Sequence, residues 1–264
     1  MDGKADTALV TYELNGPVAL IGLNRLEKRN AISDQVVEAL DKVVAQAARE
    51  ARAAVIFGHG PHFSAGLDLG EHVERTPFEG VKHSRLWHRV FDSIERGTIP
   101  YVSALSGAVV GGGFELAAST HIRVAEDSAF FAMPEGMRGI FVGGGGSVRV
   151  ARLIGVARMT DMMLTGRSVK AAEMERWGGV SYLTGEGGAL DRAKELAARA
   201  AENTDMSNYA ILNALPRIQD MSSEDGLFLE SIMASLTSAT PEAVERLRAF
   251  LEKRADKVKA PGNE

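Results

Sequence analysis

The sequence predicts an α/β fold followed by a helical C-terminal region. Short apolar and β-branched runs alternate with amphipathic helices through the first half of the chain, and helical periodicity dominates from residue 143 onward. The chain has 264 residues, 45% of them hydrophobic and 25% charged, which is enough to bury a sizeable core. We therefore expect a core over residues 1–200 and a helical region over 201–264.

The N-terminal elements follow from turn and capping residues. Runs 8–14 and 17–23 are rich in β-forming residues and flank Asn15-Gly16, a strong hairpin signal. Ser33 is a typical helix N-cap, and valines and leucine recur at helical spacing after it. Further elements are expected as a strand at 53–58, a loop at 58–66, a helix at 80–96 and strands at 101–105 and 121–126.

The middle and C-terminal elements are predicted in the same way. Glycines 111–113 lead into a helix start, and the apolar strand AFFAM at 129–133 ends in a glycine-flanked turn. Thr240-Pro241-Glu242 is a typical helix start. Amphipathic helices are expected near 144–153, 156–164, 170–177, 187–202, 205–220, 223–237 and 241–255.

Composition and charge exclude several classes of protein. The absence of cysteine excludes disulfides, thiolate nucleophiles and cysteine metal sites. A net charge of −5 argues against nucleic-acid and anionic-membrane partners. The acidic N-terminus lacks a signal-peptide pattern, and the apolar stretch 101–120 carries Glu115 and four glycines, which do not suit a bilayer. We expect a cytoplasmic protein with no membrane partner.

Glycine is concentrated in one segment. Ten of the 28 glycines fall within residues 107–146, where a usual share of about 7% predicts roughly three. Gly111-Gly112-Gly113 places bare N–H groups at the positive end of a helix, which predicts an anion or oxyanion cradle. Close strand–helix packing is the alternative. The run matches neither the dinucleotide-binding pattern nor the P-loop.

Two glutamates lie in or next to apolar segments, where a charged side chain lowers stability unless it is paired or functional. Glu115 is one turn into an apolar helix, and Glu135 follows an apolar strand. Two carboxylates in one pocket would supply general acid–base chemistry, although each alone could be a cap or a solvated residue. His121 falls past the turn of Glu115 and is expected to be structural. No metal site is expected, because metal-ligand spacing is absent from His59, His62, His72, His83 and His88.

From Asn24 to Arg254 the sequence resembles the enoyl-CoA hydratase/isomerase (crotonase) superfamily. Six segments that resemble family motifs occur in the family's order. They are NRLEKRNAIS (24–33), HFSAGLDL (62–69), SGAVVGGGFELAAST (106–120), FAMPEGMRGIFVGGGG (131–146), LTGRSVKAAEMERWGGV (164–180) and FLEKR (250–254). The resemblance implies a crotonase-like spiral core of stacked ββα turns. It also implies a C-terminal helical trimerisation region, with trimers often paired into hexamers.

The resemblance further implies an acyl-CoA thioester as substrate, with no additional cofactor. The backbone N–H groups of Leu67 and Gly112 would form an oxyanion hole that stabilises the enolate. The implied reaction is syn hydration of a trans-2-enoyl-CoA to a 3-hydroxyacyl-CoA, with Glu115 as base and Glu135 as acid. Isomerisation, dehydration and thioester hydrolysis remain alternatives within the family, and a non-catalytic acyl-CoA binder is an alternative outside enzymes.

Coenzyme A contacts are also implied by the resemblance. Lys28 and Arg29 offer cations for phosphates, although either could be a solvated surface charge. Ala65 and Asp68 would line the adenine and pantetheine channel through backbone atoms. Phe250 and Lys253 match positions that reach a neighbouring subunit's coenzyme A.

The chain departs from the family pattern in two places. Thr120-His121-Ile122 stands after the central helix where an aspartate is common. Arg138 and the glycine run 143–146 follow Glu135, and four glycines predict a mobile loop and an altered acyl pocket, for example for a branched or aromatic group.

Overall fold

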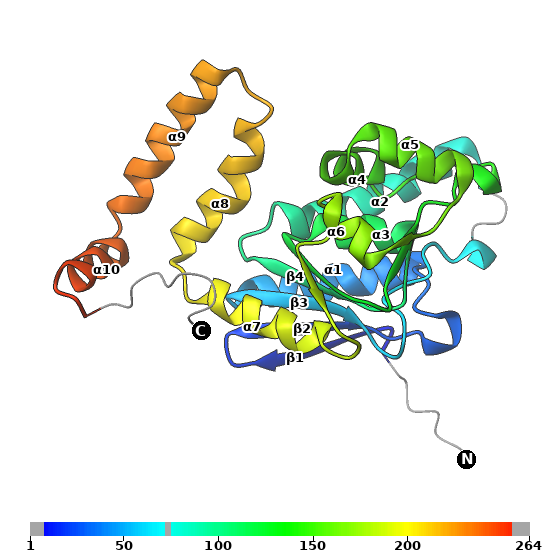
Figure 1. Ribbon diagram of the computed structural model, residues 1–264, viewed down its shortest axis with the longest axis horizontal. Helices are drawn as coiled ribbons and strands as arrows, with labels where there is room; N and C mark the ends of the chain where they lie inside the picture. The colour runs from blue at the N-terminus through cyan, green and yellow to red at the C-terminus, as the bar shows by residue number, and fades with distance from the viewer. Residues whose placement is uncertain (1–7, 72–74, 255–264) are drawn as a thin grey trace, which may run out of the picture. The chain divides into compact units, whose positions relative to one another are not determined.

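The computed structural model describes residues 8–71 and 75–254. The chain divides into two compact units, residues 1–202 and 203–264. Figure 1 shows strands and helices mixed in the first unit and helices in the second. No helix in the described ranges has both the length and the apolar character needed to cross a bilayer.

A six-stranded sheet forms the base of the first unit. Its order is β1-β2-β3-β4-β6-β9, with only the β1–β2 pair antiparallel. The predicted hairpin forms, and Gly16 has the positive φ of 55° that its tight turn requires. The strands are β1 (Val10–Asn15), β2 (Val18–Leu23), β3 (Ala53–Gly58), β4 (Tyr101–Leu105), β6 (Ile122–Glu126) and β9 (Tyr182–Thr184).

Alternating residues of this sheet pack into two separate cores. In β2, Ala19 and Ile21 join the larger cluster with α1 and α2, whereas Val18 and Leu20 join a smaller cluster with α7. Both faces of the strand are therefore buried, as is typical of a sheet covered by helices on both sides. The helices are α1 (Asp34–Glu50), α2 (Pro77–Glu95), α3 (Gly112–Ser119), α4 (Gly146–Ile154), α5 (Val156–Thr165), α6 (Ala171–Arg176) and α7 (Ala189–Ala201).

A second sheet is made of three short strands from different parts of the first unit. Its strands are β5 (Ala108–Val110), β7 (Phe130–Ala132) and β8 (Val169–Lys170), in the order β5-β7-β8. Single parallel bridges, Ile32 with Leu67 and Ser64 with Val109, extend this pairing into the loops. Segments that are distant in the sequence are thus joined through their main chains beside the N-terminus of α3.

The second unit contains α8 (Asp205–Ile218), α9 (Ser223–Ser238) and α10 (Pro241–Leu251). Thr204, Ser222 and Thr240 cap these helices with their side-chain oxygens. Apolar side chains of all three helices are exposed in the single chain. Examples are Tyr209, Ile211, Leu215, Leu227, Phe228, Leu247 and Phe250.

Candidate active site

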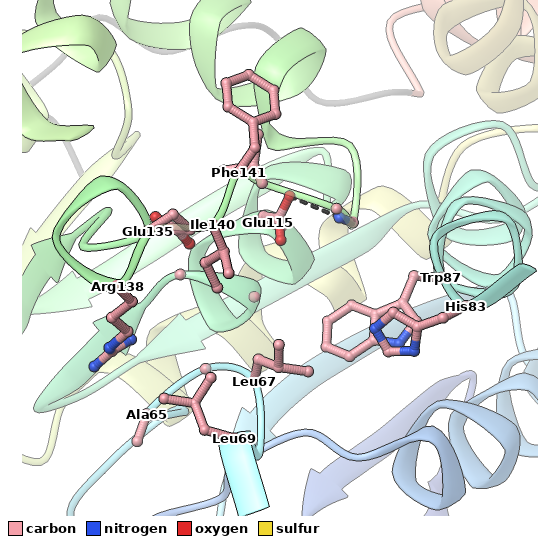
Figure 2. Close-up of a pocket in the computed structure, with 16 residues that line it drawn as sticks. Ala65, Leu67, Leu69, His83, Trp87, Glu115, Glu135, Arg138, Ile140 and Phe141 are labelled. Atoms are coloured by element: carbon pink, nitrogen blue, oxygen red, sulfur yellow. Dashed lines mark hydrogen bonds between the residues drawn. The ribbon is translucent and has the colours of Figure 1, made fainter. Parts of the chain in front are cut away.

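A small cavity opens where four segments of the first unit meet. It is lined by residues 65–69, by α2, by the start of α3, and by the loop between residues 135 and 144. Figure 2 shows Glu115 and Glu135 on one side of this cavity, Leu67 opposite, and Trp87 with His83 at one end.

The direction of the Leu67 amide is set by a main-chain bridge at the cavity wall. The Ile32 N–H donates to Gly66 O at 2.7 Å, and the Asp68 N–H donates to Ile32 O at 2.9 Å. Successive N–H groups of an extended chain point to opposite sides, so the Leu67 N–H points away from Ile32. It makes no hydrogen bond within the described ranges.

The Gly112 amide is the second unengaged donor, because the first N–H groups of a helix lack intrahelical acceptors. It makes no hydrogen bond with any residue of the described chain. A Cβ atom at Gly112 would lie 2.8 Å from Trp87 Cζ3 and 3.5 Å from Leu67 N, so only glycine fits and the two amides are neighbours. The predicted pair of donors is therefore brought together.

Glu115 lies on a helix whose eight residues are all buried. Its Oε1 accepts hydrogen bonds from Gly144 N at 2.9 Å and Gly146 N at 2.8 Å. Burial raises the pKa of Glu115, while those two amide donors and the charge of Arg149 oppose the rise.

The glycine run 143–146 contacts Glu115 directly through Gly144 and Gly146, and the expected mobility of this loop stays a prediction. A Cβ at Gly144 would lie 3.0 Å from Glu115 Oε2, and one at Gly146 would lie 2.9 Å from Glu115 Oε1. The bare backbone lets the loop approach the carboxylate closely and donate to it.

Glu135 precedes the short helix Gly136–Arg138 and is 7% exposed. Its Oε2 is buried and has no hydrogen-bond partner in the described chain. Burial is the main cause that raises the pKa of Glu135 to about 7, and the charge of Glu115 adds to the rise. A Cβ at Gly111 would lie only 2.8 Å from Glu135 Oε1, so this glycine makes room for the carboxyl group.

Of the predicted coenzyme A contacts in this unit, only Ala65 lines the cavity. The Ala65 N–H donates to Arg29 O at 2.9 Å, which places the exposed Lys28 and Arg29 beside the loop that carries Leu67. Both cations are thus near the loop that carries Leu67 but do not line the cavity itself.

The side chain of Asp68 is engaged within the protein. It is buried and forms an ion pair with Arg25 at 2.9 Å, and its Oδ1 accepts from Gly70 N at 3.1 Å. Burial acts to raise the pKa of Asp68, but the hydrogen bonds from Arg25 and Gly70 outweigh it and lower the pKa. Any ligand contact at this position therefore has to use the backbone.

Other sequence predictions have different outcomes. His121 is structural, as expected, because its Nδ1 accepts from Tyr101 N at 2.9 Å and its Nε2 bonds Glu95 O at 3.1 Å. Phe250 and Lys253 are exposed residues of the second unit, and their roles stay predictions. No cluster of three metal-ligating side chains occurs in residues 8–71 and 75–254; His72 lies outside those ranges.

Sequence reasoning missed the wall formed by α2. The Trp87 indole N–H donates to Asp34 Oδ1 at 3.3 Å, and His83 Nδ1 lies 2.6 Å from the same oxygen. Arg75 forms an ion pair with Asp34 Oδ2 at 2.9 Å. The spacing of His83 and Trp87, four residues apart on one helix face, was the available signal.

Two unengaged amides beside two buried carboxylates can stabilise a developing oxyanion and move protons next to it. A family model of enoyl-CoA hydratase/isomerase matches residues 13–260. The chain belongs to the enoyl-CoA hydratase/isomerase family. Its α/β fold is accordingly the crotonase-like spiral, and it is a hydratase-like enzyme of the lyase type.

Individual relatives span almost the whole chain. Short-chain-enoyl-CoA hydratase of Clostridium acetobutylicum is 30% identical over 248 residues, which cover 93% of this chain and 95% of the relative. 2,3-Dehydroadipyl-CoA hydratase of Escherichia coli K12 is 31% identical over 246 residues, which cover 92% and 95%. A crystal structure of a candidate enoyl-CoA hydratase from Rhodopseudomonas palustris CGA009 superposes with a TM-score of 0.91 at 52% identity, covering 95% of this chain and 97% of that one.

Proposed function

We propose that the protein catalyses the syn addition of water to a trans-2-enoyl-CoA, which yields a 3-hydroxyacyl-CoA. The observation that carries this proposal is the meeting of Glu115 and Glu135 with the unengaged amides of Leu67 and Gly112 around one cavity. The hydratase names of the relatives support the same reaction class.

In this proposal the thioester carbonyl accepts hydrogen bonds from the Leu67 and Gly112 amides. Glu115 takes a proton from a water molecule, whose oxygen bonds to Cβ while the electron pair of the double bond moves toward the carbonyl oxygen. The resulting enolate is stabilised by the two amides more than the ground state is. Glu135 then delivers a proton to Cα, and proton exchange with solvent restores both carboxyl groups.

The environments of the two glutamates support these different roles. Burial raises the pKa of Glu115, but its Oε1 accepts two amide hydrogen bonds that oppose this rise and favour the ionised form that a base needs. Glu135 has an unpartnered oxygen and a pKa raised to about 7 by burial, which favours the protonated form that an acid needs.

The substrate is proposed to be a coenzyme A thioester with a compact acyl group, and no further cofactor is required. The Trp87 ring at the end of the cavity, whose indole N–H donates to Asp34 Oδ1, supports a compact group. Lys28 and Arg29 would contact phosphates, and the backbone at Ala65 and Asp68 would line the channel. Phe250 and Lys253 would reach the ligand of a neighbouring subunit.

The test is hydration of crotonyl-CoA and of longer and aromatic enoyl-CoAs, followed by the loss of enoyl-thioester absorbance. We expect Glu115→Gln and Glu135→Gln each to lower kcat by about 10²- to 10⁴-fold. The control Glu173→Gln, at a half-buried residue outside the cavity lining, should keep the wild-type rate. Mass spectrometry of the products separates hydration from isomerisation, dehydration and thioester hydrolysis. Binding of these esters without turnover would instead indicate a non-catalytic binder.

We also propose a homotrimer, with trimers pairing into a homohexamer, in the cytoplasm. The exposed apolar side chains of α8, α9 and α10 support an assembly that covers them. Light scattering during size-exclusion chromatography gives the subunit number directly.

A further inference from the structure

Arg149 is a buried cation that the proposed chemistry does not use directly. It lies on α4 with its side chain 6% exposed, and each of its three nitrogens is engaged. Nε donates to Glu95 Oε2 at 2.7 Å, and Nη2 pairs with Asp92 Oδ1, both on α2. Nη1 donates instead to a backbone oxygen, Gly144 O, at 3.0 Å.

That backbone oxygen sits between the two donors that hold Glu115. Gly144 O belongs to the peptide that joins Gly144 to Gly145, while Gly144 N and Gly146 N donate to Glu115 Oε1. A guanidinium bonded to this oxygen therefore fixes the plane of the Gly144–Gly145 peptide. Because this peptide lies in the chain between the two donors, its orientation sets the direction of both N–H groups.

The loop has the conformational freedom that makes such a brace necessary. Gly145 has a positive φ of 102°, and the helix that follows begins at Gly146 without a side-chain cap. A Cβ at Gly145 would lie 2.2 Å from Arg149 Nη1, so the arginine occupies the space beside this glycine. Four consecutive glycines lose much conformational entropy on ordering, and contacts from outside the run must compensate for this loss.

We propose that Arg149 is a positioning residue for Glu115, acting through the Gly144–Gly145 peptide and anchored to α2 by Asp92 and Glu95. This inference rests on the proposed role of Glu115 as the base. The two acids on α2 fix the orientation of the guanidinium, which links α2 to the Glu115 carboxylate through a single backbone oxygen and also places a positive charge near that carboxylate.

The experiment compares Arg149→Met with Arg123→Met as a matched control. Arg123 is also buried and also donates to backbone oxygens, those of Thr120 and Gly179, but it lies beyond the opposite end of α3. We expect R149M to lower kcat for crotonyl-CoA by about 10²-fold, the cost of a misplaced catalytic group, with KM changed less than about threefold. R123M should lower thermal stability yet keep kcat within about threefold of wild type.

Arg149→Lys provides a second variant that keeps the charge and one donor. It should recover about tenfold of the kcat lost in R149M, because a lysine can bond Gly144 O without the fork that also engages both acids. If both Arg149 variants keep wild-type kcat, or if kcat falls equally in R149M and R123M, the positioning role is wrong.

A double variant separates this inference from the proposed function. If Arg149 acts through Glu115, adding R149M to the Glu115→Gln variant should lower kcat little further. Full multiplicative loss in the double variant would overturn the inference while leaving the function intact. Wild-type hydration by Glu115→Gln alone would instead overturn the proposed function.

Discussion

Replacing Glu135 with glutamine should change how the stability of the folded protein depends on pH. The pKa of Glu135 rises from 4.5 to about 7 on folding, mainly because the carboxyl is buried. The folded state then holds this proton more tightly than the unfolded state. Its contribution to stability is complete below pH 4.5 and is lost as the pH rises through about 7. Glutamine cannot ionise, so the Glu135→Gln variant lacks this loss.

The magnitude follows from the difference between the two pKa values. At about 1.4 kcal/mol for each pH unit, the full effect is roughly 3 kcal/mol. Between about pH 5 and pH 8.5, the free energy of unfolding of E135Q should gain about 2–3 kcal/mol relative to wild type. Because Glu135 Oε2 has no partner, an amide there also leaves a polar group unsatisfied, which lowers stability by a constant amount at every pH.

Urea denaturation of both proteins at a series of pH values, at one protein concentration, isolates the pH-dependent part from that constant offset. Stability curves that run parallel across this range would contradict a raised pKa for Glu135. A gain of wild type on E135Q as the pH rises would contradict it too, because that sign requires a lowered pKa.

Two further substitutions test the backbone of the site. Gly112→Ala should lower kcat by about 10²- to 10³-fold, as removal of one oxyanion donor does. The new Cβ would meet Trp87 Cζ3 at 2.8 Å and displace the amide. Steady-state kinetics measure the effect, circular dichroism checks the fold, and an unchanged kcat would contradict the prediction. Asn30→Ala should lower the free energy of unfolding by about 3 kcal/mol, because the Asn30 side chain donates to the backbone oxygens of His59 and His62 at 2.9 and 2.8 Å. A free energy of unfolding within about 1 kcal/mol of wild type, measured by chemical denaturation, would contradict this.

Local sequence signals predicted the long elements well and the short ones poorly. Asn15-Gly16 and Ser33 fixed the hairpin and the start of α1, because turn and capping chemistry act over a few residues. The helix expected from residue 80 begins earlier, at Pro77, because Thr76 and Glu79 form a capping box. The strands β5, β8 and β9 have two or three residues, too few to show periodicity, and depend on pairing with distant segments.

Some site residues could likewise be predicted from the sequence and others could not. Glu115 and Glu135 could be proposed because a charge inside an apolar segment is conspicuous in one dimension. Arg149 could not, because nothing local to it indicates a bond to Gly144 O or to acids on α2, more than fifty residues away. The wall made by Trp87 and Asp34 was missed for the same reason, since it joins two helices through one side-chain oxygen.

The two glutamates belong to parts of the molecule that differ in cooperativity. Glu115 is carried by α3, which has no exposed residue and can release its amides to solvent only when the core opens. Glu135 is followed by four exposed residues, 136–139, which can open locally at lower free energy. Hydrogen exchange should therefore report the proposed acid and the proposed base in separate unfolding units. Sequence changes in the loop after Glu135 can therefore alter the proposed acid while α3 and the proposed base keep their fold.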